Sequence, residues 1–249
     1  MKRVLICLIT MILSMALVKT VNMLSFDTAY LLYPFFAQFD PDNVFIVLTI
    51  HHICQAVIAL LIICVVSKIL KLSISEFGFN SNQFKFSLKA VLIFVGIWSI
   101  IQAGIGLMVI TVFKAPASFG FPLNTRNYIG YFLFEILLSG TSEEIMFRAL
   151  VISLMIYVWK NLFKKESHLT LMVILSSSLV FMFDHINFSF SPFRITYINL
   201  LQQLTALIFG TFYGYLFTRT KSIAGPILAH NLLNGAIAII GLVFALTLG

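Results

Sequence analysis

Charged side chains are scarce in this sequence. Asp, Glu, Lys and Arg make up 10% of the 249 residues, whereas hydrophobic residues make up 60%. The mean hydropathy is +1.04. A water-soluble domain of this size needs fewer apolar side chains and a larger share of charge. The composition therefore excludes a soluble globular protein and favours a polytopic membrane protein.

A basic patch and a cysteine framework are also missing. The net charge is +7, but the Lys and Arg residues are spread between apolar runs, as membrane-flanking charges are, so we predict no nucleic-acid partner. Cys7, Cys54 and Cys64 fall inside apolar runs without CxxC spacing. We interpret them as small lipid- or core-facing residues rather than disulfide partners.

The N-terminus lacks a cleavage pattern. Lys2 and Arg3 precede an apolar run at residues 4–18, as in a signal peptide, but residues 19–22 contain no small-x-small site. We therefore interpret this run as an uncleaved first span.

Seven apolar runs are long enough to cross a bilayer, which takes about 20 helical residues. We predict spans near residues 4–23, 44–67, 88–113, 128–159, 168–187, 196–218 and 222–247. An amphipathic or re-entrant piece at 30–39 and an interfacial turn at 72–80 are also expected. The sequence thus predicts an all-α, polytopic transmembrane helical bundle of about seven spans (six to eight).

Basic residues concentrate in alternate loops, which predicts a cytoplasmic N-terminus by the positive-inside rule. Lys114 and Arg126 fall on the opposite side and weaken this pattern.

Charge returns inside the fourth apolar run, at residues 139–148 (SGTSEEIMFR). Three of the chain's 25 charged residues lie within six positions there, and a charge at membrane depth costs several kcal/mol or more. A helix of about 32 residues would extend ~48 Å against ~30 Å of hydrocarbon, so it must tilt, protrude or break. The weak helix formers at 139–142 are the expected place for a kink or a close helix contact.

Helical spacing separates the two acids. Glu144 and Arg148 are four residues apart and can pair along the helix. Glu143 points about 100° away from Glu144, so it is left to face a polar cavity, where a carboxylate suits a general base. His230 and Asn234 share the same four-residue spacing and can present two hydrogen-bonding groups to one cavity.

Several hydrolase motifs are absent from the sequence: HExxH, a GxSxG elbow, and a second intramembrane aspartate beside Asp184. What remains is water activated by Glu with His assistance, with His and Asn stabilising an oxyanion during amide hydrolysis.

The other polar residues inside the predicted spans can also be explained by structural roles. A lone intramembrane His is often an interhelical hydrogen-bond partner, and Gly210-x-x-x-Gly214 favours helix packing. His51 and His52 have no acidic neighbour, which favours packing. Asp184 and Glu135 are ambiguous, because each could orient a partner or lie at the interface.

Three motifs on successive spans together resemble the CPBP family: Glu143-Glu144-x-x-x-Arg148, Phe181-x-x-x-His185 and His230-x-x-x-Asn234. That family comprises type II CAAX prenyl endopeptidases and bacteriocin-processing or bacteriocin-immunity proteins, also called the abortive-infection family. The resemblance covers roughly residues 72–249, because the turn at 76–79 is also similar to the family. It implies N-terminal spans at 1–71 and a CPBP-like catalytic membrane core at 72–249.

The resemblance also implies roles for individual residues. Glu143 would be the water-activating base, and His185 would help to bind or orient that water. His230 and Asn234 would hold the oxyanion. The supporting residues would be Glu144, Arg148 and Phe181.

Metal dependence stays open at this point. Family members are commonly called metalloproteases, and Glu143, His185 and His230 could ligate a single Zn²⁺ with a water completing the site. The same residues can also act without metal.

Together these features predict an intramembrane endopeptidase, with a membrane-associated peptide or protein and the lipid bilayer as partners. The expected setting is a bacterial cytoplasmic membrane, in peptide maturation, bacteriocin self-immunity or signalling. One alternative is a non-catalytic membrane immunity or regulatory protein that retains the site for structure. Another is a small-solute transporter, although no matching broken helices in two repeated halves are visible.

Overall fold

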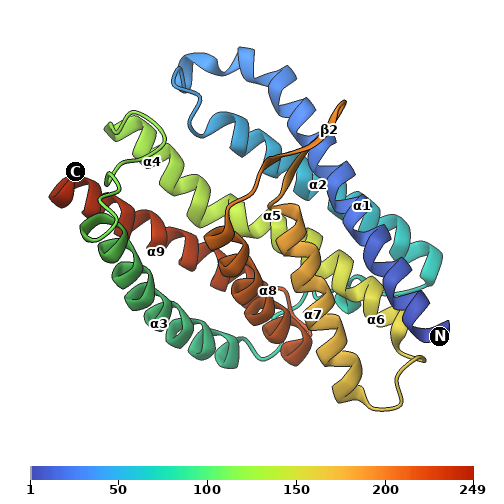
Figure 1. The fold of residues 1–249 in the computed structure, drawn as a ribbon. Helices are drawn as coiled ribbons and strands as arrows, with labels where there is room; N and C mark the ends of the chain where they lie inside the picture. The colour runs from blue at the N-terminus through green and yellow to red at the C-terminus, as the bar shows by residue number, and fades with distance from the viewer. Residues whose placement is uncertain (1) are drawn as a thin grey trace.

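Long apolar helices form the body of the structure, a computed structural model that describes residues 2–249 (Figure 1). Six of them, within this described range, are long and apolar enough to cross a membrane. They are α1 (Lys2–Leu32), α2 (Ile46–Leu70), α3 (Phe84–Thr111), α7 (Glu166–Asp184), α8 (Leu200–Thr220) and α9 (Ala224–Leu248). The chain is therefore an integral, multi-pass membrane protein, and the prediction of an all-α bundle is confirmed.

The predicted fourth span is a helix interrupted by two π-helical stretches. It consists of α4 (Thr125–Phe134), a π-helical stretch at Glu135–Ser139, α5 (Gly140–Glu144), a second π-helical stretch at Ile145–Ile152, and α6 (Ser153–Trp159). This segment joins the six long helices to give the seven helical segments expected. Single-turn π-bulges inside helices occur frequently at functional sites.

The expected close helix contact occurs at α5. The π-helical stretches flank it on either side, and Gly140 lies directly against α9. A Cβ added at Gly140 would lie 2.6 Å from the Cβ of His230, closer than real side chains come. Glycine at this position therefore lets α5 and α9 approach each other.

The segment from α4 to α6, residues 125–159, is called the broken helix below. The hydrophobic core surrounds its second half. Every residue from Ile145 to Ile152 is buried. Around them pack side chains from α1, α2 and α7, such as Val18, Ile63 and Val180. In contrast, α3 exposes most of its large apolar side chains, as a lipid-facing helix does. The two acids of α5 thus lie at the edge of the tightest packing in the molecule.

The first span is longer than the sequence predicts. We expected it to end near residue 23, but the helix continues to Leu32. The polar residues Lys19, Asn22 and Asp27 lie on α1. Contacts with Asp184 of α7 compensate Lys19 and Asn22. The predicted re-entrant piece is instead the end of α1 followed by short 3₁₀ turns at Tyr33–Phe35 and Ala37–Phe39.

The next two connections differ in how well the sequence predicts them. The interfacial turn at 72–80 is confirmed as a 3₁₀ turn, Ile74–Phe77, held by a capping box between Ser73 and Glu76. The chain after α7 instead forms an unexpected antiparallel hairpin, β1 (Asn187–Phe190) and β2 (Phe193–Tyr197). The boundaries predicted for spans five and six, at 187 and 196, ran into this hairpin and were wrong.

Candidate active site

Glu144 is the ion-paired acid of the two. Its side chain is fully buried, with Oε2 lying 3.1 Å from Nε of Arg148 and Oε1 lying 2.8 Å from Nδ1 of His230. Arg148 is also fully buried and donates from Nη2 to the backbone oxygen of Gly210 at 3.2 Å. The i,i+4 ion pair expected from the spacing is confirmed. It joins the broken helix to α8 and α9.

Aromatic rings enclose this ion pair. The guanidinium carbon of Arg148 lies 4.8 Å from the ring centroid of Phe181 and 5.1 Å from that of Tyr213. Tyr213 in turn stacks on His230 with centroids 4.9 Å apart. Sequence reasoning singled out Phe181 but missed Tyr213, whose signal lay inside the Gly210-x-x-x-Gly214 segment that we attributed to packing alone.

That segment does pack two helices together. A Cβ added at Gly210 would lie 3.2 Å from Phe181 and 3.3 Å from Ser178, both on α7. The predicted packing role of this glycine is confirmed, and Gly210 also supplies the carbonyl that Arg148 binds.

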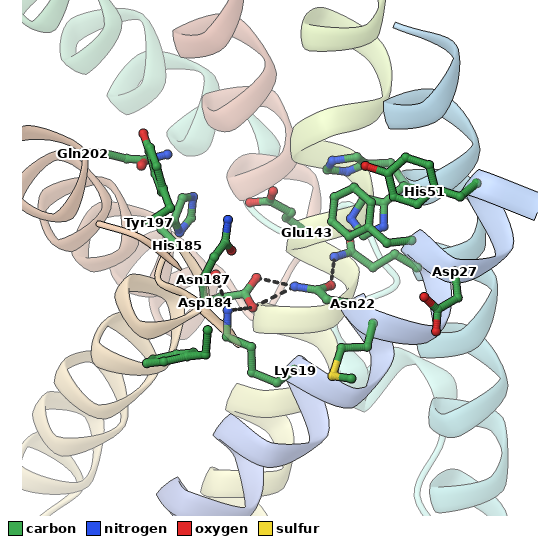
Figure 2. A pocket seen from close by; sticks show the side chains of 16 residues that line it. Lys19, Asn22, Asp27, His51, Glu143, Asp184, His185, Asn187, Tyr197 and Gln202 are labelled. Carbon is green, nitrogen blue, oxygen red and sulfur yellow. Dashed lines mark hydrogen bonds and ion pairs between the residues drawn. The ribbon is translucent and has the colours of Figure 1, made fainter. Parts of the chain in front are cut away.

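Glu143 faces the other way, into a cavity of about 540 Å³ that His185 also lines (Figure 2). Its Oε2 is buried and has no hydrogen-bond partner within the part of the chain that the structure describes. The nearest charged or titratable atom recorded for it is Nε2 of His230, at 3.8 Å. This distance exceeds that of a direct hydrogen bond.

The partners of the two histidines fix their tautomers. The backbone oxygen of Phe181 can only accept, so Nδ1 of His185 donates to it at 2.9 Å. Nδ1 of His230 likewise donates to the carboxylate of Glu144. In its neutral form each imidazole therefore has its lone pair on Nε2, and Nε2 of His230 is the atom nearest to Glu143.

Asn234 is not brought into the cavity. Its Nδ2 donates to Oε2 of Glu135 at 2.8 Å and to Oγ of Ser139 at 3.1 Å. Asn234 and His230 are both absent from the cavity lining, although both contact the broken helix. Glu135, which was ambiguous in the sequence, is thus the partner of Asn234.

The candidate zinc ligands are not gathered into one group. Within residues 2–249, no three His, Cys, Asp or Glu side chains lie close enough together to hold a metal ion. Glu143, His185 and His230 therefore do not fit a zinc ion as they are arranged, and we derive no step through one. The single Zn²⁺ stays a prediction from the sequence.

Sequence reasoning missed the part of the cavity lining that α1 and α2 contribute. Its polar members are Lys19, Asn22, Asp27, His51, His52 and Gln55. Figure 2 shows Lys19 and Asn22 reaching Asp184 across the cavity floor. His52 also bonds through Nδ1 to the hydroxyl of Ser142, the residue before Glu143. The one available signal was the His51, His52 and Gln55 set, which helical spacing places near one face of α2.

Residues 125–236 match a family model described as type II CAAX prenyl endopeptidase Rce1-like. This match supports the assignment to the CPBP family that the sequence motifs predict. The match to this family includes the broken helix and the motifs of α7 and α9, and it leaves α1 and α2 outside. CPBP proteins of this type are intramembrane proteases, so the match also supports membership in a membrane protease family. No curated protein and no solved structure matches the chain.

Proposed function

We propose that this chain is an intramembrane endopeptidase that hydrolyses a peptide bond in a membrane-associated peptide or protein. One observation carries the proposal: Glu143 lines a cavity and has a buried carboxylate oxygen with neither a hydrogen-bond partner nor an Arg or Lys ion pair among the described residues, whereas its neighbour Glu144 is paired with Arg148 and His230. Leaving a buried acid without a partner costs free energy, and such costs persist mainly where a reaction or a ligand uses the group.

A small shift of the Glu143 side chain would admit a water molecule between it and His230. At 3.8 Å, Oε2 of Glu143 and Nε2 of His230 are too far apart to bond directly, but after that shift they can each accept a hydrogen from one water between them. Both groups accept in the tautomer described above. A water held in this way presents a lone pair outward, as a nucleophile must.

The reaction then proceeds by general-base catalysis. As the water oxygen bonds to the substrate carbonyl carbon, one water proton passes to Glu143 and the carbonyl electron pair moves onto its oxygen. The tetrahedral intermediate collapses, the C–N bond breaks, and the proton held by Glu143 passes to the leaving nitrogen. Water and an amide give a carboxylic acid and an amine, with Glu143 regenerated.

His185 lines the same cavity and offers its Nε2 lone pair to the substrate or to a second water. The oxyanion roles predicted for His230 and Asn234 require rearrangement. Asn234 must release Glu135 or Ser139 before its amide can donate to a new oxygen. We therefore expect substrate binding to move α9 slightly relative to the broken helix.

The family description names CAAX prenyl endopeptidases, which makes a prenylated peptide the first substrate to test. The biological settings that we propose are bacterial peptide maturation, bacteriocin self-immunity or signalling at the cytoplasmic membrane. A prenyl chain is not required by the cavity, because polar side chains line much of it.

The decisive experiment is cleavage by the purified protein in liposomes. Quenched peptides with and without a C-terminal farnesyl chain are incubated in H₂¹⁸O, and products are analysed by mass spectrometry. The wild type is expected to cleave at least one peptide and to place ¹⁸O in the new carboxyl group. Glu143→Gln is expected to lower kcat by about 10²- to 10⁴-fold, the usual contribution of a general base.

Glu166→Gln is the matched control, because Glu166 lies exposed at the start of α7 and outside the cavity. It is expected to cleave like the wild type. Full activity in Glu143→Gln, at normal membrane abundance, contradicts the proposal and favours a non-catalytic protein.

A further inference from the structure

A chain of hydrogen bonds crosses the cavity floor from α7 to α2. Nζ of Lys19 lies 3.3 Å from Oδ1 of Asp184. Nδ2 of Asn22 donates to both carboxylate oxygens of Asp184, at 2.7 and 2.6 Å. Nε2 of Gln55 then donates to Oδ1 of Asn22 at 2.6 Å. Figure 2 shows the Lys19, Asn22 and Asp184 part of this chain.

This series of hydrogen bonds has a fixed donor-to-acceptor direction. The carboxylate of Asp184, paired with Lys19, can only accept hydrogen bonds, so Asn22 must present its NH₂ group to it. The oxygen of Asn22 then faces α2, and Gln55 must donate its own NH₂ group to it. The orientation of both amides, which geometry alone leaves ambiguous, is thus set by Asp184.

Because the amide NH₂ of Gln55 donates to Asn22, the carbonyl oxygen of Gln55 points away from Asn22. Gln55 is 1% exposed and lines the cavity that holds Glu143. Its Oε1 is buried and has no hydrogen-bond partner among residues 2–249. A buried acceptor without a partner is destabilising, and here it is held in that state by three other residues. This oxygen can accept a hydrogen bond from a donor on a molecule bound in the cavity.

Gln55 also lines the same cavity as the carboxylate of Glu143. One turn earlier on α2, His52 bonds to Ser142, the residue that precedes Glu143 on α5. This bond fixes α2 against α5, so a group held by Gln55 lies in the same cavity as Glu143. The cavity volume, about 540 Å³, is in the range of sites that enclose small ligands or short segments.

We propose, on the basis of the endopeptidase function above, that Gln55 accepts a hydrogen bond from a backbone N–H of the substrate. A polypeptide offers such donors at every residue, whereas a hydrocarbon or prenyl chain offers none. The cavity floor therefore binds the peptide part of the substrate. Gln55 and Asn22 lie outside the matched residues 125–236, so this contact comes from helices that the family match does not include.

The test pairs a change in the protein with a change in the peptide. In a series of cleavable peptides, each amide other than the scissile one is replaced in turn by an ester, which removes one N–H donor. For the wild type, one ester position is expected to lower kcat/KM by about three- to tenfold, the usual range for one hydrogen bond. Gln55→Met is expected to lower kcat/KM for the all-amide peptide by a similar factor and to show no further loss with that ester.

Two further variants guard against a purely structural effect. Gln102→Met, at a half-buried glutamine of α3 outside the cavity, is expected to keep wild-type kinetics and the full ester penalty. Asp184→Asn lets the amide chain reverse direction, so it is expected to reduce the ester penalty although Gln55 is intact.

The outcomes separate the two proposals. If the wild type cleaves and Glu143→Gln does not, but Gln55→Met keeps the ester penalty or no position shows one, the role of Gln55 is overturned and the endopeptidase stands. If the wild type cleaves no peptide in the series, both are overturned.

Discussion

Helix α5 has two unlike sides. On its closed side, Glu144 meets Arg148 and His230, and the rings of Phe181 and Tyr213 cover the ion pair. On its cavity side, defined by Glu143 and the facing residues of α1 and α2, Oε2 of Glu143 and Oε1 of Gln55 are buried with neither a hydrogen-bond partner nor an Arg or Lys ion pair among the described residues. Two adjacent glutamates therefore have opposite environments. We infer that the closed side holds the helices in place and that the cavity side does the chemistry.

The largest effect is expected on the closed side. Arg148→Met removes one partner of a fully buried ion pair, which typically costs about 3–5 kcal/mol because the other charge is left unpaired. Reversible unfolding in mixed micelles should show this loss in the free energy of unfolding. Arg194→Met, at an exposed position on β2, is the control and should change it by about 0.5 kcal/mol or less. Equal stability of the two variants would remove the structural role of the closed side.

The junction between the two sides can be disturbed at Gly140. An alanine there would place a Cβ 2.6 Å from the Cβ of His230, so α5 and α9 must separate. Overpacking of this kind costs about 1–3 kcal/mol. The shift should also move His230 away from Glu143 and slow cleavage.

Gly104→Ala is the matched control for that change. Its added Cβ on α3 meets no atom within 4 Å, and alanine in place of glycine in a helix adds about 0.5–1 kcal/mol of stability. Unfolding and cleavage should be measured on both variants. Gly140→Ala should lower the free energy of unfolding, and Gly104→Ala should raise it. Unimpaired cleavage by Gly140→Ala would show that the spacing of α5 and α9 does not position the site.

The smallest effect is expected at Tyr213. Its hydroxyl is buried without a hydrogen-bond partner among the described residues, while its ring stacks on His230. Tyr213→Phe keeps the ring, so the free energy of unfolding should change by less than about 1 kcal/mol. A larger loss, measured by the same unfolding experiment, would mean that the hydroxyl binds a water or the substrate.

The sequence predicted the closed side better than the cavity side, for a physical reason. The Glu144–Arg148 pair, the break near Gly140 and the turn at 72–80 depend on residues close together in the chain. Helical spacing and weak helix formers are enough to locate such features.

The cavity side depends on distant partners. Lys19 and Asn22 belong to a membrane helix because Asp184, more than 160 residues away, compensates them. No local pattern reveals that pairing, so α1 was predicted too short and its share of the cavity was missed. The roles of Glu143, His185, His230 and Asn234, and the division at residue 72, stay predictions.

The most direct test of this account compares Glu143→Gln with Glu144→Gln in the same unfolding experiment, which needs no substrate. Glu144→Gln breaks a buried ion pair and should lower the free energy of unfolding by about 3 kcal/mol or more. Glu143→Gln removes an acid whose buried oxygen has no hydrogen-bond partner, so it should leave the free energy of unfolding unchanged or raise it. Equal destabilisation by the two substitutions would contradict the division of labour between these neighbouring acids.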